Sequence, residues 1–452
     1  MDIPEREQSR RAWTASLLLS VIALLAQWWL ILNPGYYSHD ELQWAAYADV
    51  RVGPGFFHAV SWLDFSAPQY RPLTFNLWLW LSHFLFEHPR AFHALLVAWG
   101  TANAVMLQRL LLRARVALPV ATMAALVFVL SPFAVFVQGW VATIGDLVWV
   151  SCALLVAVVS LRVRRPLVAG AAACAITVIA LLGKESALSI PALLLVAWCF
   201  DRRSGRWLAP LAGSASAALL YLGLRAGPLL FAPAHGNLYD WQLAYIPLRW
   251  LEYQLFPPSV SAIEAFQTID GRYSHPAVIA SALLWLGACI ALWRIHWRWA
   301  AAFVVGGAAA LGPVLVLGQS SDQYGYGFMA FCCALFALAW PRLRHWGKAL
   351  LLVQLFLVAG HSLNIMRAMH QVGVVQARFS PALAGVIGDA TQAAPLRLKL
   401  APGSEFWLFG RLTHEIPSYR GVAMGERVRI VGADEAADYL VEPDGRLTRV
   451  PR

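Results

Sequence analysis

The sequence predicts an all-α polytopic membrane protein with a small C-terminal domain that contains β-strands. Of its 452 residues, 59% are hydrophobic and only 13% are charged, whereas soluble domains carry about 25% charged residues. The apolar residues gather in runs of about 20, the length that crosses a bilayer. Trp residues stand at many ends of these runs, as in an interfacial belt. This composition excludes a soluble enzyme, a disordered chain and a coiled coil.

The apolar runs predict about eleven transmembrane helices. No small-residue cleavage site follows the first run, which is therefore interpreted as a retained span. Segment 72–86 is apolar but short, and an interfacial or re-entrant helix is expected there. The six cysteines fall inside apolar runs and are interpreted as packing residues. The predicted spans are 13–32, 92–113, 117–137, 141–161, 166–182, 187–200, 207–224, 276–293, 299–318, 326–340 and 349–365.

Arginine and lysine predict the orientation of these spans, because cytoplasmic loops of membrane proteins keep the positive charge. With the N-terminus in the cytoplasm, every second short loop is rich in Arg, and the opposite short loops hold only Lys184. The net charge of +10 follows from the same rule and does not indicate nucleic acid. The C-terminus is then expected on the outer, periplasmic face of a bacterial inner membrane.

Three polar regions are predicted on that outer face. Within a membrane domain 1–365, they are the first loop, 33–91, and a second long loop, 225–275. The third is a small C-terminal domain, 366–452, which is polar, contains Gly and Pro, and does not show a helical pattern. Short alternating runs predict strands in it at Arg397–Leu400, Glu405–Phe409 and Arg427–Val431.

Acidic residues gather on the same predicted face, and the first group is His39-Asp40-Glu41. One of two adjacent carboxylates can act as a base near neutral pH. The alternative is a solvated loop in which Asp40 starts a short helix. Gly145-Asp146 begins the fourth span, where the helix dipole alone favours an acidic residue.

Two further groups stand between predicted spans. Lys184-Glu185 offers a cation for a lipid phosphate, or else a local ion pair. In Asp322-Gln323-Tyr324-Gly325-Tyr326 the tyrosines can line a headgroup pocket or belong to an interfacial belt. The first-loop histidines match no metal motif, and neither a metal nor a cofactor is expected.

In their order along the chain, these groups resemble the GT-C glycosyltransferases, above all the protein O-mannosyltransferase type and its relatives with tetratricopeptide repeats. The resemblance covers about residues 13–365. Five segments of the chain carry it. They are His39-Asp40-Glu41; Tyr70-Arg71-Pro72-Leu73 with Asn103; Pro132 with Gly145-Asp146; Lys184-Glu185-Ser186-Ala187-Leu188 with Pro191; and Arg249-Trp250-Leu251 with Phe256-Pro257 and Ser261.

The sequence departs from the family pattern in three places. Thr143 and Ile144 stand where an Arg usually precedes the acidic residue of the second outer loop. Asp322-Gln323-Tyr324 replaces a Glu-Arg-Tyr motif and so lacks its Arg. No tetratricopeptide repeat follows the membrane domain. These departures leave Lys184 and Arg71 as the expected phosphate ligands and leave the acceptor open.

The resemblance implies an inverting transfer of a sugar from a polyprenyl-phosphate donor to an acceptor hydroxyl of a glycan, lipid or protein. Undecaprenyl phosphate is the expected carrier, since the Arg-rich basic residues and the missing repeats suggest a bacterial protein. Asp40 is the expected base, with Glu41 as its neighbour or alternate. The substrate-binding candidates are His39, Arg71, Asp146, Lys184, Glu185, Gln323 and Tyr324.

Three other classes of protein stay open. A secondary transporter would place polar groups near the membrane midplane in repeated halves, and Asn103 and Asn364 are the obvious midspan polar residues. A membrane scaffold would bind partners through its outer tail. An O-antigen ligase or polymerase would also use lipid-linked sugars, but is expected to rely on Arg and His in its outer loops.

Overall fold

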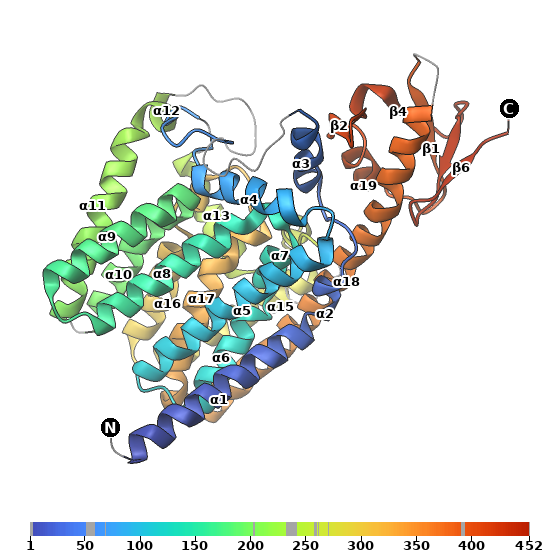
Figure 1. Cartoon of the computed structure of the whole chain (residues 1–452). Coiled ribbons are helices and arrows are strands. Elements are labelled where there is room, and N and C mark those ends of the chain that lie inside the picture. The colour runs from blue at the N-terminus through green and yellow to red at the C-terminus, as the bar shows by residue number, and fades with distance from the viewer. Residues whose placement is uncertain are drawn as a thin grey trace.

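The computed structural model describes most of the chain and shows a helical bundle that carries a small sheet at its C-terminal end (Figure 1). The described residues are 3–50, 59–67, 69–201, 204–231, 242–256, 260, 262–269, 271–389 and 394–451. Pro257 and Ser261, which belong to the last of the five segments that resemble the GT-C family, lie outside them.

Within these residues, eight helical segments are long and apolar enough to cross a membrane. Their number and composition are those of a multi-pass membrane protein, as predicted. They are α5 (Pro89–Arg113), η1 with α8 (Val141–Arg162), α9 (Pro166–Gly183), η3 with α11 (Gly205–Leu224), α15 (Pro276–Trp293), α16 with η5 (Trp297–Val316), η6 with α17 and η7 (Asp322–Arg342), and α18 (His345–Asp389).

Three predicted spans take other forms. The span 117–137 consists of α6 (Leu118–Val129) and α7 (Pro132–Gly139), which meet at 52° and make a ninth crossing if counted as one. Ser131 caps α7 and Pro132 opens it, which explains the break. The span 13–32 is α1 (Ile3–Ala26) with α2 (Trp28–Ile31), and 187–200 lies in the shorter apolar segment formed by η2 (Glu185–Leu188) and α10 (Ser189–Phe200). The total of eleven stays a prediction.

Short helices of the two long loops gather at one end of the bundle, opposite the N-terminus (Figure 1). We call this the outer end. Segment 72–86 forms α4, which has 14 residues and a length of about 21 Å, less than the roughly 30 Å of a bilayer core. It packs against α8 and α9. The loop helices are α3 (His39–Val50), α4 (Pro72–Leu85), α12 (Ala226–Phe231), η4 (Leu243–Tyr245), α13 (Ile246–Gln254) and α14 (Phe266–Ile269).

The helix α18 corrects the predicted boundary at 365. It has 45 residues and is therefore about 67 Å long, so it is long enough to cross a membrane and to continue well beyond it. Its outer half buries Met366, Met369, Gly373 and Gln376, spaced three or four residues apart as on one face of a helix. Gly373, one of the glycines that suggested a non-helical segment, instead allows the backbone of α18 to approach Asn33 closely.

Beyond α18, the C-terminal part forms a four-stranded sheet in the order β4-β1-β5-β6. Strand β1 is parallel to β4 and β5, and β6 is antiparallel to β5. A second pair, β2 and β3, is antiparallel. The elements are β1 (Leu396–Leu400), α19 (Phe406–Arg411), β2 (Ser418–Tyr419), β3 (Val422–Ala423), η8 (Gly425–Arg427), β4 (Val428–Val431), β5 (Tyr439–Val441) and β6 (Leu447–Arg449).

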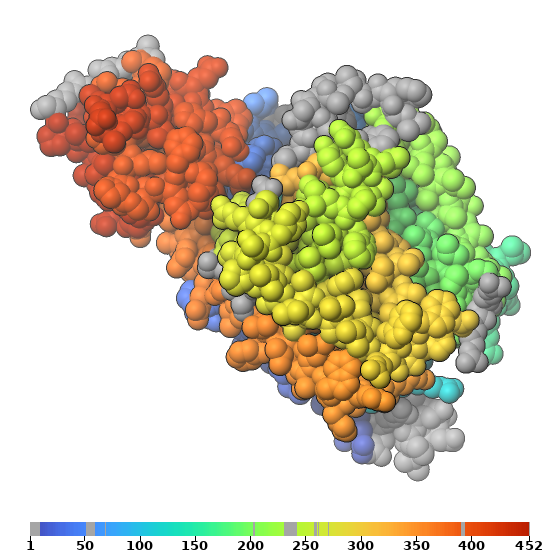
Figure 2. Space-filling model, turned by 180° about the vertical axis from the view of Figure 1, so that it is seen from behind, coloured from blue at the N-terminus to red at the C-terminus, as the bar shows by residue number. Residues whose placement is uncertain are grey.

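Two of the three predicted strands are confirmed, as β1 and β4, and the third is wrong. Residues 405–409 enter the helix α19 instead, because the neighbouring side chains of Leu408 and Phe409 are both buried, which a strand's alternation does not allow. Phe409 stacks edge-on against Phe379 of α18, with ring centroids 4.9 Å apart. Figure 2 shows the C-terminal part, in red, projecting beyond the bundle at the end of α18.

Candidate functional site

Asp146 and Lys184 form a buried ion pair at the outer end of the bundle. Asp146 stands in the first turn of α8, Lys184 joins α9 to η2, and their exposed fractions are 1% and 5%. The Lys184 ammonium contacts the Asp146 carboxylate, whose other oxygen accepts a hydrogen bond of 3.3 Å from the Trp149 indole. The ring centroid of Tyr324 lies 4.7 Å from Lys184 Nζ, so the ammonium faces both a carboxylate and an aromatic ring.

Two glycines make this pairing possible. A Cβ atom on Gly145 would lie 2.8 Å from Thr74 Oγ1 and 3.1 Å from the carbonyl oxygen of Gly183. Thr74 of α4 donates a hydrogen bond of 2.6 Å to the same carbonyl. The missing side chains therefore let the ends of α8 and α9 approach beneath α4, which brings Asp146 and Lys184 into contact.

Arg71 and Glu185 form a second ion pair beside the first. Arg71 precedes α4, and its Nε lies 2.6 Å from Glu185 Oε2, with both side chains about one-fifth exposed. The adjacent residues Lys184 and Glu185 thus pair with partners from distant parts of the chain. The alternative of a local Lys184–Glu185 ion pair is wrong.

A third cation at this place was not predicted. Arg225, at the end of α11, is 1% exposed and donates hydrogen bonds to the carbonyl oxygens of Phe65 and Ala67 in the first loop. The buried Tyr221 ring lies within the electrostatic reach of Arg225, Arg71 and Glu185. The sequence held one signal for it, because an Arg at the start of an outer loop runs against the usual charge distribution. Arg71, Asp146, Lys184, Glu185 and Arg225 are called the charge cluster below.

Asp40 lies at the start of α3, apart from the charge cluster, and its side chain is 35% exposed. His39 Nε2 lies 3.2 Å from Asp40 Oδ1, and His39 Nδ1 lies 2.8 Å from Glu415 Oε2 in the C-terminal part. The Ser38 hydroxyl is 3.5 Å from Asp40 Oδ2. Asp40 is therefore open enough to meet a substrate.

Glu41 is buried, and its carboxylate accepts hydrogen bonds from backbone amides rather than facing solvent. Its Oε2 accepts hydrogen bonds from the amides of Tyr37 and Ser38, at 2.6 and 2.9 Å. The bond to Ser38 is half of a capping box, in which the third residue of a helix reaches back to its N-cap. Oε1 accepts a bond of 2.7 Å from Val141 in η1. Burial raises the pKa of Glu41 from 4.5 to about 8, against the effect of these amide bonds.

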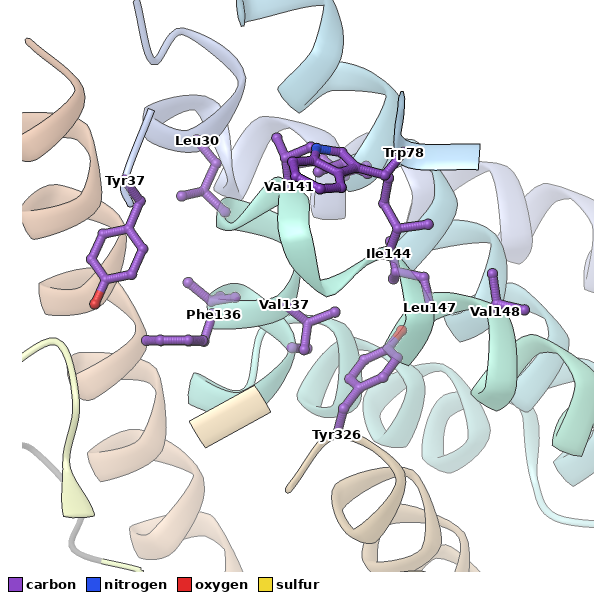
Figure 3. Packing of buried hydrophobic residues seen from close by; sticks show 14 of the residues in the cluster. Leu30, Tyr37, Trp78, Phe136, Val137, Val141, Ile144, Leu147, Val148 and Tyr326 are labelled. Carbon is purple, nitrogen blue, oxygen red and sulfur yellow. The ribbon is translucent and has the colours of Figure 1, made fainter. Parts of the chain in front are cut away.

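Glu41 thereby ties the first loop to the segment that leads into Asp146. The ring of Tyr37 packs on Phe136 and Trp140, with centroids 5.7 and 5.8 Å apart. Figure 3 shows Tyr37, Phe136 and Val141 in the same buried apolar cluster. The position of Asp40 relative to the charge cluster is thus fixed through Glu41 and this apolar contact. Glu41 is therefore a structural residue, while Asp40 stays partly exposed.

The predicted Asp322–Tyr326 group divides between the site and the core. Tyr324 covers Lys184, as described. Gln323 is 9% exposed, and Asp322 is fully buried and accepts a bond of 3.4 Å from the Ala265 amide. Tyr326 instead turns into the bundle (Figure 3), where it stacks on Phe128 and bonds to Asn103 at 3.2 Å. The idea that Tyr326 lines a headgroup pocket is wrong.

An apolar cavity of about 430 Å³ lies among the helices of the bundle. Its upper wall includes Phe133 and Tyr253, and the Tyr253 hydroxyl donates a bond of 3.0 Å to the Ser321 carbonyl oxygen. Lower down, it is lined by apolar side chains of α6, α15, α17 and α18. A cavity of this lining suits an apolar chain.

Across the described part of the chain, no three His, Cys, Asp or Glu side chains gather in a way that could hold a metal ion. Comparison with protein-family models finds no match, and comparison with curated proteins finds none either. The likeness to the GT-C family therefore rests on the quoted residues alone.

Proposed function

We propose that the protein is a membrane glycosyltransferase of the GT-C type, which moves a sugar from a polyprenyl-phosphate donor to an acceptor hydroxyl at the outer face. The observation that carries the proposal is the charge cluster at one end of the bundle, together with an apolar cavity lined by Tyr253, which bonds to Ser321 just before η6. A lipid-linked phosphate needs both features, a cationic site for its headgroup and an apolar space for its tail.

The charges of the cluster suit a phosphodiester. Arg71, Lys184 and Arg225 carry three positive charges, and Asp146 and Glu185 carry two negative ones. Buried charge is stable only where it is compensated, and a sugar phosphodiester with a single negative charge would neutralise the excess. Lys184 and Arg71 are the proposed phosphate ligands, and Asp146 holds the Lys184 ammonium in place.

The reaction that follows is a single displacement. The acceptor oxygen attacks the anomeric carbon and its proton passes to Asp40, whose partial exposure admits the acceptor. The bond from the anomeric carbon to the phosphate oxygen breaks, and the electron pair leaves with the phosphate. Lys184 and Arg71 stabilise the second negative charge that develops there. Because attack and departure lie on opposite faces of the sugar, its configuration inverts.

A transporter would instead use polar groups deep in the bundle. Asn103 donates to Leu147 and Tyr326 and accepts a bond of 2.6 Å from Ser151. Asn364 donates to the carbonyl of Val260 at 3.2 Å. These midspan amides bond to neighbouring protein groups, which gives no support to a substrate site at that depth.

The proposed setting is the inner membrane of a bacterium, with the N-terminus in the cytoplasm and the charge cluster facing the periplasm. Undecaprenyl phosphate is the proposed carrier. The direct test compares the masses of envelope glycans and glycolipids between wild type, a deletion strain, and the deletion complemented with Asp40→Asn. Asp49→Asn is the matched control, because Asp49 lies on the same helix and its amide replacement can still accept the 2.8 Å bond from Ser418.

The proposal expects one sugar to disappear in the deletion, to return with wild type and Asp49→Asn, and to stay absent with Asp40→Asn. An unchanged envelope in the deletion strain, together with uptake of a labelled solute by vesicles containing the protein, would favour a transporter instead.

A further inference from the structure

We propose that Glu415, in the C-terminal part, is a positioning residue for Asp40 and acts on it through His39. The inference rests on the proposed function, since it assumes that Asp40 is the base. It assigns the C-terminal part a direct share in the active site, so that the membrane domain alone does not contain the complete site.

Three side chains from two parts of the chain form a line at this point. The Glu415 carboxylate follows α19, and its Oε2 lies 2.8 Å from His39 Nδ1. The opposite ring nitrogen, Nε2, lies 3.2 Å from Asp40 Oδ1. Each nitrogen therefore faces its own carboxylate, with the Ser38 hydroxyl also 3.3 Å from Nδ1, and the His39 ring is held from both sides. The second oxygen of Asp40, Oδ2, accepts a bond of 3.5 Å from the Ser38 hydroxyl and is the oxygen assigned to the acceptor.

The contact between the C-terminal part and the first loop does not depend on Glu415 alone. Ser418 of β2 donates a bond of 2.8 Å to Asp49, and Arg420 forms an ion pair with Glu87. Tyr419 between them is 4% exposed. Figure 1 shows β2 beside α3, where these contacts lie. These contacts already hold the C-terminal part against the first loop. The carboxylate of Glu415 is therefore not needed for that attachment.

The position of Glu415 explains what the line does for Asp40. The Glu415 carboxylate holds the His39 ring from the Nδ1 side, so that Nε2 stays directed at Asp40 Oδ1. In the transfer step the acceptor proton goes to Asp40 Oδ2, while His39 holds Oδ1 in place, in the way that a carboxylate orients a catalytic histidine.

The test measures initial rates of sugar transfer in membranes that contain the full-length protein, using the sugar identified by the envelope comparison. The variants are Glu415→Gln, His39→Gln and the double variant. Ser418→Ala is the control, because it removes a different contact across the same interface. We expect each single variant to slow transfer by about tenfold, with unchanged donor KM, which is less than the roughly 10²–10⁴-fold that a positioned acid–base group itself contributes.

Because the two residues act in series, the double variant is expected to be no slower than the slower single variant. Glu415→Asp is expected to recover part of the rate, and Ser418→Ala to stay within about twofold of wild type. Resistance to protease at the end of α18 checks that the C-terminal part stays docked.

The inference is overturned if Glu415→Gln transfers at the wild-type rate, if the two losses multiply, or if Ser418→Ala and Glu415→Gln lose activity equally. A failure of the proposed function is seen separately, as a wild-type protein that transfers no sugar.

Discussion

Replacing Lys184 with Met tests the charge cluster through the stability of the protein. The variant removes the ammonium but keeps an unbranched side chain of similar length, so the packing against Tyr324 is largely retained. It leaves the Asp146 carboxylate 1% exposed, with the Trp149 indole 3.3 Å away as a neutral donor. Removing one partner of a buried ion pair costs about 3–5 kcal/mol, because the other charge stays out of water. We expect Lys184→Met to lower the free energy of unfolding by that amount.

The double variant Lys184→Met/Asp146→Asn removes the uncompensated charge and is expected to recover most of that loss, to within about 1 kcal/mol of wild type. Thermal unfolding of the full-length protein in detergent, followed by tryptophan fluorescence, ranks the three proteins. Both variants are expected to transfer no sugar, because the ammonium is the proposed phosphate ligand. A single variant as stable as wild type, or a double variant less stable than the single, would refute the reasoning.

Three further outcomes are expected. Gly145→Ala forces a methyl group against Thr74, and it should lower stability by about 1–3 kcal/mol and reduce sugar transfer. Gly205→Ala, with open space around it, should change neither stability nor transfer. Melting and activity assays of the two variants check this. Because burial raises the pKa of Glu41 from 4.5 to about 8, the folded chain keeps a proton that the unfolded chain loses. This contribution to stability is present in full below pH 4.5 and is lost as the pH rises through about 8. Melting curves across this window should show the loss in wild type and lack it in Glu41→Gln, and parallel curves would contradict it. Ala288→Phe fills part of the apolar cavity and should raise the donor KM several-fold in transfer kinetics while kcat stays unchanged.

The spans could be predicted because each apolar run carries its own signal. The continuation of α18 could not be predicted from polarity, since half of each turn there faces solvent and Gly373 looks like a breaker until its contact with Asn33 is seen. The short helix α19 was missed for a related reason. Its adjacent residues Leu408 and Phe409 are both buried by tertiary contacts. A local pattern of alternating residues does not show such contacts.

For the site, the sequence indicated which residues share a face but not which ones touch. Asp146 and Lys184 were predicted at the same surface, yet their pairing depends on the close approach of two helix ends, which the spacing of residues along the chain does not reveal. Glu41 could not be separated from Asp40 by sequence, because burial alone distinguishes the two carboxylates. Glu415 carried no local signal at all, since its role arises only from its contact with His39 in a distant part of the chain.

The central claim is that Asp40 acts as the base of a sugar transfer, and the envelope comparison tests it most directly. The masses of envelope glycans and glycolipids are compared in a deletion strain complemented with wild type, Asp40→Asn or Asp49→Asn, each at equal protein level in the membrane. The account predicts that one sugar is present with wild type and Asp49→Asn and absent with Asp40→Asn. Full restoration of that sugar by Asp40→Asn would contradict it.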